Sequence, residues 1–423
     1  MARIPTQKIR ILRPLQIRDF RLLWTAMTVS FFGDGIYLVA IAWQVYELSN
    51  VPTALSLVGV AWSLPMVLFL LIGGVLTDRL ERRRIMVWAD ALRGVAVATM
   101  GLLAVTGSVR LWHLVGLAIL YGIGQALFAP AFGAIVPEIV PRNLLTEANS
   151  LDSFVRQSAE RLFGPALGGF AIQLVGAGWS LILDAATFMV SAVILLMIST
   201  RPAPAEEPQS ALSGIKEGLT YVRSQPWLLA TLLSALMSLM FALGPFQILL
   251  PFLVKNELNG SAADLGLVLA AGGVGAVVAS LVMGQRGLPR RHITFMYVMW
   301  AAGVGSLVIY GVATRLWHLV VAEFFAWGMF TLGLIVWATL MHRLVPPRLL
   351  GRVTSVDWTV STAFVPLSFA LTGPVSTAIG VRETFIWAGI LGALATMVFL
   401  LWPGVRDPEG VVVRNDEKVP AGG

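Results

Sequence analysis

The chain contains no cysteine and carries little charge: 13% of its 423 residues are charged, whereas 57% are hydrophobic. The absence of cysteine excludes disulfides, thiolate metal sites and cysteine nucleophiles. Soluble proteins carry about 25% charged residues, and this much apolar surface cannot be buried inside a water-soluble core. The composition therefore predicts a multi-pass, all-α membrane protein, so the net charge of +7 is interpreted by its location and not as nucleic-acid binding.

Phosphate-binding and catalytic signatures are also missing from the sequence. No Walker or GxGxxG motif has a convincing context, and the glycine-rich segment 270–280 is typical of helix packing inside a membrane. No cluster of His and Asp or nucleophile constellation stands at a predicted membrane surface. We therefore expect no cofactor, no metal site and no enzymatic activity.

Apolar runs near the ~20 residues needed to cross a bilayer recur along the whole chain. Twelve are predicted, at residues 22–48, 53–77, 85–106, 111–135, 152–175, 178–199, 228–254, 263–284, 292–313, 317–341, 353–378 and 382–402. The first run exceeds a signal-peptide core of roughly 7–15 residues, so it is predicted to be an uncleaved membrane helix.

A polar, proline-rich stretch separates the sixth and seventh runs. It predicts a bundle at residues 1–200, a cytoplasmic linker at 201–227, a second bundle at 228–403 and a cytoplasmic tail at 404–423. Within the linker, the pattern near Leu212–Val222 predicts a short amphipathic helix.

The basic residues indicate the orientation of the chain. The two terminal segments and the loops that alternate with them hold 23 of the 30 Lys and Arg residues, whereas the opposite loops hold four: Arg110, Lys255, Arg315 and Arg382. Cytoplasmic loops are enriched in Lys and Arg. Both termini are therefore predicted to be cytoplasmic.

The two halves of the chain repeat each other. The hexapeptide RLWHLV occurs at residues 110–115 and again at 315–320, and at the same offset VPRNLLTEANSLD (140–152) aligns with VPPRLLGRVTSVD (345–357). Six spans thus duplicate with the same orientation, which is how the halves of major facilitator transporters are related. Such halves transport by rocking against each other, although a duplication that only built a bundle would leave the same pattern.

Several segments resemble motifs of the major facilitator superfamily. GGVLTDRLERRR (73–84) resembles motif A, with Gly74, Asp78, Arg79, Arg82 and Arg84 in the usual positions but Glu81 where the broad pattern has Gly. GPALGG (164–169) resembles motif C, the antiporter signature, through Gly164, Pro165, Gly168 and Gly169. The D-R-x-E-R-R-R form, FFGDGIYLVAIAW in the first span and LLGRVTSVDW after the tenth are similar to the drug:proton antiporter branch that includes macrolide efflux proteins and enterobactin exporters.

This resemblance covers essentially the whole chain. It implies twelve transmembrane helices in two six-helix bundles, export of small molecules, and a monomer. At motif A we hypothesise a cytoplasmic latch. Asp78 would pair with a nearby Arg and with the N-terminus of the eleventh helix near Thr354–Asp357, holding the outward-facing state, with Gly74, Arg79 and Arg82 as its other residues. The second-half counterpart, MGQRGLPRRH, keeps the Arg residues but lacks the carboxylates, so an anchoring role alone does not explain Asp78 and Glu81.

Ionisable groups inside the spans are the candidate coupling residues, because each costs at least ~2.5–3.5 kcal/mol at the centre of a lipid-facing helix. Asp34 is the sharpest candidate. It lies mid-span between Gly33 and Gly35, which allow close backbone approach or a break in the helix. Desolvated there, it could take a proton near neutral pH, or it could bond a neighbouring helix. Glu160 and Glu323 are further candidates for proton coupling, with an interfacial position as the alternative for Glu323.

Other charged residues have simpler predicted roles. Asp152, Arg156 and Glu160 follow an i, i+4, i+8 spacing beside Arg161 and predict either a neutralised charge network or a gate. Asp152 and its repeat mate Asp357 are predicted to cap helix N-termini. Asp90 and Arg93 are expected to form an i, i+3 ion pair, and Asp184 to bond a neighbouring helix.

The resemblance places a substrate cavity among helices that include the first, fourth, seventh and tenth. Their aromatic and amide side chains suit a lipophilic or amphiphilic substrate: Tyr37, Gln44, Gln125, Phe128, Phe246, Gln247 and Trp327. Most of these residues could instead pack between helices or face lipid.

The sequence thus predicts a secondary active transporter in the cytoplasmic (inner) membrane of a bacterium. Its expected partners are a small-molecule substrate such as an antibiotic, drug or siderophore, protons and the bilayer. A lipid or lysophospholipid transporter is the first alternative. A membrane receptor that retains a transporter fold is the second, and the intact motifs argue against it.

Overall fold

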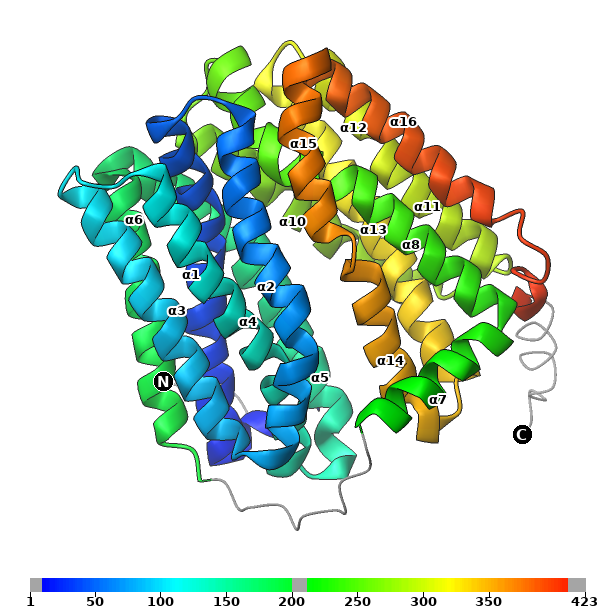
Figure 1. Cartoon of the computed structure of the whole chain (residues 1–423). Helices are drawn as coiled ribbons and strands as arrows, with labels where there is room; N and C mark the ends of the chain where they lie inside the picture. Colours follow the sequence, from blue (N-terminus) through cyan, green and yellow to red (C-terminus); the bar gives the residue numbers. More distant parts are fainter. Residues whose placement is uncertain (1–9, 200–210, 410–423) are drawn as a thin grey trace, which may run out of the picture. The chain divides into compact units, whose positions relative to one another are not determined.

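The computed structural model describes residues 10–199 and 211–409, and these residues form helices and connecting turns without a strand (Figure 1). The all-α prediction is confirmed. The helices before residue 200 are η2 (Arg10–Gln16), α1 (Arg18–Leu48), α2 (Pro52–Arg79), α3 (Arg82–Val105), α4 (Leu111–Ile139), η3 (Arg142–Leu144), α5 (Leu145–Arg156), the π-helix η4 (Gln157–Phe163) and α6 (Gly164–Leu196).

The remaining helices follow residue 210. They are α7 (Ala211–Ser224), α8 (Pro226–Gly244), η5 (Pro245–Leu249), α9 (Leu250–Phe252), η6 (Leu253–Glu257), α10 (Ala262–Arg286), α11 (His292–Gly305), α12 (Leu307–Val312), α13 (Leu316–Leu344), α14 (Pro347–Thr362), α15 (Val365–Ile379) and α16 (Val381–Phe399). Helix α7 confirms the amphipathic helix predicted near Leu212–Val222.

Eleven helical segments of the described chain are long and apolar enough to cross a membrane. One of them, Leu145–Leu196, contains two of the twelve predicted runs. Inside it Gly176 has φ 86° and ψ 164°, a conformation that glycine adopts without the steric cost of a side chain. This break divides the segment at the boundary expected between the fifth and sixth spans, so the eleven segments account for all twelve runs.

The chain divides into two compact units, which are described separately. The first comprises the described residues of Met1–Pro208 together with Val254–Ala270, and the second those of Gln209–Leu253 and Ala271–Gly423. The segment 254–270 thus belongs to the first unit, whereas the sequence assigned it to the bundle at 228–403. The linker residues 200–210 and the tail from 410 lie outside the described residues.

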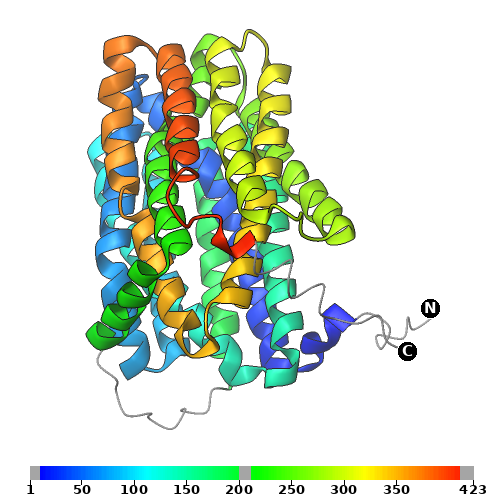
Figure 2. The same ribbon diagram turned by 90° about the vertical axis from the view of Figure 1, so that its right-hand side faces the viewer.

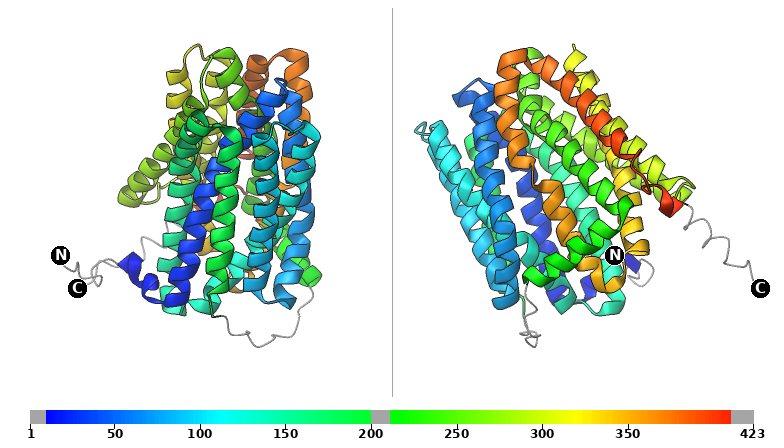
Figure 3. Two further views of the ribbon diagram at one scale, coloured as in Figure 1. Left: turned by 90° about the vertical axis from the view of Figure 1, so that its left-hand side faces the viewer. Right: turned by 45° about the vertical axis from the view of Figure 1, so that its right-hand side comes forward.

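In the first unit α1 packs along α6, α3 packs against α4 and α6, and α2 packs against α4. Figure 3 shows α1 (blue) and α6 (green) side by side. In the second unit α16 lies against α8, α11 and α12 (Figure 2), and α13 packs against α11. Buried aliphatic and aromatic side chains fill both interiors, including Met27, Met86 and Ile135 in the first and Tyr297, Trp300 and Leu340 in the second.

Small residues bring the backbones of α1 and α6 together. A methyl group placed on Gly164 would lie 2.8 Å from the Cα of Gly35 and 2.5 Å from the carbonyl oxygen of Ala159. No side chain fits in this space, and close approach of this kind is how membrane helices gain packing energy without a hydrophobic driving force. The contact fixes α6 against the part of α1 that carries Asp34.

The predicted N-capping by Asp152 and Asp357 is wrong. Helix α5 begins at Leu145 and α14 at Pro347, so both carboxylates lie well inside their helices, beyond the backbone N–H groups that a cap would satisfy. Both helices start earlier than the apolar pattern indicated, in the polar segments that precede the apolar runs. Asp357 instead accepts hydrogen bonds from Trp337 Nε1 and Ser361 Oγ, each 3.1 Å long.

Candidate functional site

Asp34 lies in the middle of α1, which continues through this position without a break. Its Oδ1 accepts a hydrogen bond of 2.9 Å from the hydroxyl of Tyr121 on α4, and its side chain is 18% exposed. The ring of Tyr121 stacks on Tyr37, one helical turn beyond Asp34, with centroids 4.4 Å apart and planes at 10°. The sequence predicted that Gly33 and Gly35 allow either close backbone approach or a break in the helix. Since α1 is continuous and both glycines lie close to neighbouring atoms, the structure shows close approach.

A buried arginine lies beside Asp34. The guanidinium of Arg93 on α3 is sandwiched between the rings of Phe128 (4.5 Å) and Phe188 (4.4 Å). These cation–π contacts hold its plane, so that its edges face the surrounding carboxylates. One edge forms an ion pair with Asp90, and Nη1 lies 3.9 Å from Asp34 Oδ1.

The ion pair of Asp90 and Arg93 confirms the i, i+3 prediction. The second oxygen of Asp90, Oδ2, accepts a hydrogen bond of 2.6 Å from Ser191 Oγ on α6. Both carboxylate oxygens of this fully buried residue are thus satisfied. Asp90 is therefore the main counter-charge of Arg93. Asp34 makes only the longer contact with Nη1 of this guanidinium.

Asp184 on α6 lies in the same region and is fully buried. Its Oδ1 accepts a hydrogen bond of 3.3 Å from Thr187 Oγ1, whereas Oδ2 has no hydrogen-bond partner among the described atoms. The expected bond to a neighbouring helix is therefore corrected to a bond within α6. Thr187, at i+3, lies on the same side of the helix as Asp184, so its hydroxyl is close enough to donate to the carboxylate.

Two residues of the charged stripe in the fifth span, Arg156 and Glu160, form an ion pair. Arg156 Nη1 lies 3.8 Å from Glu160 Oε2, both side chains are more than one-third exposed, and the guanidinium of Arg156 covers the ring of Phe31 at 4.3 Å. The chain passes from α5 into the π-helix η4 at Gln157, which widens the turn after Arg156. Such π-segments occur frequently at functional sites. The choice between a static network and a gate stays open.

Glu323 on α13 is completely buried. Its Oε2 accepts a hydrogen bond from the hydroxyl of Tyr310 on α12, and its Oε1 accepts one of 2.8 Å from Trp327 Nε1. Gly272 on α10 packs directly on this cluster, since a methyl group there would lie 2.4 Å from Trp327. The second unit thus contains its own buried carboxylate with both oxygens satisfied, and the two predicted roles of Glu323, proton coupling and an interfacial position, stay predictions.

Side chains of the motif A segment contact the end of α4 and the residues that follow α6. Arg82 forms an ion pair with Glu138 at the end of α4, and Arg83 donates a hydrogen bond of 2.7 Å to the carbonyl of Ile198. Glu81 pairs with Arg83 at 2.8 Å and with Arg84 at 2.6 Å. The side chains of Asp78 and Arg79, and the surroundings of Gly74, lie outside the described part of the structure, so the latch stays a prediction.

The glycines of motif C face two neighbours. A methyl group on Gly168 would lie 2.9 Å from the Cα of Ile36 on α1, and one on Gly169 would lie 2.4 Å from the carbonyl oxygen of Ala262 at the start of α10. Gly266 approaches the carbonyl oxygen of Pro165 equally closely, at 2.4 Å. Within the first unit, motif C therefore allows α6 to contact α1 and the first turns of α10.

The predicted cavity residues make mostly protein contacts. Phe128 covers Arg93, Gln125 accepts a hydrogen bond of 2.8 Å from Trp62 Nε1, and Phe246 packs edge-on against Trp327. Gln44 is buried on α1, whereas Gln247 is half-buried in η5. Their role toward a substrate stays a prediction.

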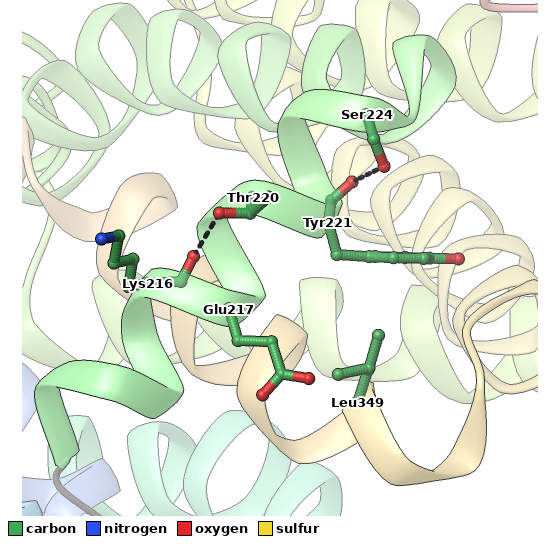
Figure 4. Close-up of a pocket in the computed structure, with 6 residues that line it drawn as sticks. All are labelled: Lys216, Glu217, Thr220, Tyr221, Ser224 and Leu349. Atoms are coloured by element: carbon green, nitrogen blue, oxygen red, sulfur yellow. Dashed lines mark hydrogen bonds between the residues drawn. The ribbon is translucent and has the colours of Figure 1, made fainter.

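A shallow groove of about 440 Å³ lies elsewhere, between α7 and α14 of the second unit (Figure 4). It is lined by Lys216, Glu217, Thr220, Tyr221, Ser224 and Leu349. Two of its hydroxyls, on Thr220 and Ser224, donate to backbone carbonyls of α7. Burial of its ring raises the pKa of Tyr221, so this phenol stays protonated. The groove does not include the intramembrane carboxylates.

Sequence reasoning missed the partners that come from other helices. Tyr121, Phe188 and Ser191 complete the surroundings of Asp34, Asp90 and Arg93, although nothing in their local sequence distinguishes them from ordinary span residues. Tyr310, the partner of Glu323, was missed for the same reason. Glu138 was the detectable exception, because a carboxylate at the end of a span needs a partner.

Residues 9–411 match the transmembrane secretion effector family of the major facilitator superfamily. The multidrug efflux pump Tap of Mycolicibacterium fortuitum is 28% identical, with 91% of this chain and 96% of Tap covered. Macrolide efflux protein A of Streptococcus pyogenes is 23% identical, with 88% of this chain and 93% of that protein covered. The chain is thus similar over nearly its full length to efflux proteins.

Solved transporter structures share the fold. A bacterial homologue of the human lysosomal transporter Spinster, in an inward-facing and unoccupied conformation, superimposes with a TM-score of 0.70 at 15% identity, covering 94% of this chain and 98% of its own. A POT family transporter in complex with 5-aminolevulinic acid gives a TM-score of 0.74 at 12% identity, covering 92% and 96%. These similarities support the major facilitator fold that the sequence motifs predicted.

Proposed function

Because the chain belongs to the transmembrane secretion effector family of major facilitator transporters, we propose that it exports small hydrophobic or amphiphilic compounds in exchange for protons. Antibiotics, drugs and siderophores are the substrate classes. Membership of the family makes the chain a multi-pass membrane transporter. The efflux proteins to which it is similar support the direction of transport.

The position of Asp34 carries the proposal of proton coupling. Asp34 is an intramembrane carboxyl with one hydrogen bond from Tyr121, and the nearest cation, Arg93, is already paired with Asp90. A carboxyl that lacks a full counter-charge in a poorly hydrated site gains free energy by binding a proton. Its charge therefore responds to the proton gradient, whereas that of Asp90 stays fixed.

We assign proton uptake by Asp34 to the step that biases the transporter toward one side of the membrane. A proton and a substrate that favour opposite states exchange across the membrane by alternating access. Glu160 and Glu323 are the further coupling groups of the proposal, and the motif A latch around Asp78 would hold one of the states. The protein acts as a monomer in the bacterial cytoplasmic membrane with both termini in the cytoplasm.

Efflux from energised vesicles tests this proposal. Inverted membrane vesicles that contain the protein are loaded through a pH gradient with a fluorescent dye or a radiolabelled macrolide, and transport is compared with empty vesicles. We expect transport to stop when an ionophore collapses the gradient, and Asp34→Asn to reduce gradient-driven transport to the level of empty vesicles. Transport that continues after the gradient collapses would contradict proton coupling.

Asp264→Asn is the matched control. Asp264 accepts two hydrogen bonds of 2.8 Å from Ser261 at the start of α10, and Asn keeps an acceptor oxygen there. The control removes one carboxylate from the chain without touching the Asp34 site. Full activity in Asp34→Asn would remove Asp34 from the mechanism, and equal losses in both variants would indicate a general effect on folding.

A further inference from the structure

Asp184 lies near Arg93 and has no part in the proposed mechanism, yet its environment is unusual. The residue is fully buried, and its Oδ2 has no hydrogen-bond partner among the described atoms. A buried polar oxygen that is left unsatisfied costs about 1–3 kcal/mol, and more when it is charged. Its environment therefore disfavours a permanently ionised Asp184.

Asp184 lies directly beside the part of α1 that carries Asp34. A methyl group placed on Gly33 would lie 2.3 Å from Asp184 Oδ1 and 2.0 Å from Thr187 Oγ1. The Asp184 carboxyl therefore packs against the backbone of the residue next to Asp34. Two carboxyls from different helices thus lie in one region of the first unit, the buried Asp184 and the partly exposed Asp34.

The charges of this region do not balance if every acid is ionised. Arg93 is the cation that faces both carboxyls, and Asp90 already pairs with it. The titratable groups within electrostatic reach of Asp34 or Asp184 come from every element packed around them: Tyr37 on α1, Asp90 and Arg93 on α3, Tyr121 on α4 and Glu160 on η4. Among the residues that the structure describes, no second positive charge faces Asp34 and Asp184.

Buried carboxyls in this situation retain protons. An isolated ionised carboxylate in an apolar environment becomes neutral instead of staying charged. Two carboxyls that share one site do not both ionise easily, and they titrate as a pair in two steps. Each carboxyl therefore influences when the other takes up or releases its proton.

We propose that Asp184 is a second proton-binding residue, which forms a proton-exchanging pair with Asp34. The inference deepens the proposed function and rests on it for its role in transport. When the pair takes up a proton, an O–H bond forms on a carboxylate oxygen and the charge of the pair rises by one; release reverses this change, and no other bond is altered. Arg93, held between Phe128 and Phe188, stabilises the ionised member of the pair.

Infrared difference spectroscopy of the purified full-length protein in nanodiscs tests the pair directly. The carbonyl stretch of a protonated carboxyl is distinct from that of a carboxylate, so a pH titration counts the buried carboxyls that change protonation. The wild type should show two buried carboxyls titrating in coupled steps. Asp184→Asn and Asp34→Asn should each leave one, and Asp264→Asn should leave both.

The conservative variant Asp184→Glu separates proton binding from packing. It should restore the second titrating carboxyl, with a shifted carbonyl frequency, even if it lowers the thermal stability. A titration of Asp184→Asn that equals the wild type would overturn the inference. A band that responds to sodium chloride at constant pH would overturn it as well, because the pair would then bind a metal cation.

Vesicle transport distinguishes this inference from the proposed function. If transport by the wild type ignores the proton gradient while two carboxyls titrate, the proposed function fails and the pair stands. If transport depends on the gradient but Asp184→Asn titrates like the wild type, only the pair fails. If transport depends on the gradient and the carboxyl pair titrates as proposed, Asp184→Asn should move fewer protons per substrate than the wild type.

Discussion

A single methyl group at the contact of α1 and α6 should destabilise the first unit. In Gly164→Ala the new methyl group would lie 2.5 Å from the Ala159 carbonyl oxygen and 2.8 Å from the Gly35 Cα. Both obstacles are backbone atoms, so no side-chain rotation relieves the overlap. Overpacking of this kind costs about 1–3 kcal/mol, and we expect the free energy of unfolding to fall accordingly.

Gly116→Ala provides the matched control on α4. No atom lies within 4 Å of a methyl group placed there, so the substitution meets open space. Alanine is favoured over glycine in a helix by about 1 kcal/mol. Both substitutions gain this propensity, so it cancels between them, and the two variants should differ in unfolding free energy by the overpacking cost of about 1–3 kcal/mol, with Gly164→Ala the less stable.

An SDS titration of the purified protein in mixed micelles measures this difference. The unfolding of the first unit can be followed by circular dichroism together with an intrinsic tryptophan signal. If Gly164→Ala is as stable as Gly116→Ala, the α1 and α6 backbones are not in close contact, and the inferred packing of motif C is wrong. Gly35→Ala, which meets the same contact from the other helix, should repeat the loss.

Two further predictions follow from other contacts. Tyr310→Phe removes the hydroxyl that donates to Glu323 while keeping the ring that stacks on Phe385, so the free energy of unfolding should fall by about 1.5–3 kcal/mol in the same SDS titration; an unchanged midpoint would show that Glu323 finds another donor. Because the chain has no cysteine, Ser108→Cys gives a single thiol in an exposed turn. An impermeant maleimide should label it in intact cells, whereas Ser224→Cys at the end of α7 should react only after permeabilisation; the reverse pattern would contradict the proposed orientation.

The membrane spans and the ion pair within one helix could be predicted, because both depend on residues that are close together in the sequence. A bilayer requires a fixed length of apolar chain, so runs of this length identify helices such as α1 and α16 without tertiary information. Asp90 and Arg93 are close because three residues separate them on a helix. The N-caps predicted at Asp152 and Asp357 failed because apolar runs mark where a helix enters the membrane and not where it begins.

The cross-helix contacts of the buried site could not be predicted in this way. Tyr121 meets Asp34 from α4, and Phe188 reaches Arg93 from α6, although both look like ordinary apolar-span residues in the sequence. Asp34 could be identified as a candidate from the sequence, because an ionisable side chain inside a membrane span costs free energy and needs a reason to be there. Sequence reasoning had no means of showing that Asp184 lies against Gly33 with an unsatisfied oxygen.

The sequence by itself determined that this chain is a helical membrane protein of repeated halves with a few carboxylates inside its spans, because length, apolarity and periodicity act along the chain. The tertiary structure decided which of those carboxylates share a counter-charge. It satisfies Asp90 with Arg93 and Ser191, whereas no second cation of the described part of the chain lies beside Asp34 and Asp184. That distinction depends on distances between different helices, and the packing of small residues such as Gly33, Gly35 and Gly164 sets those distances.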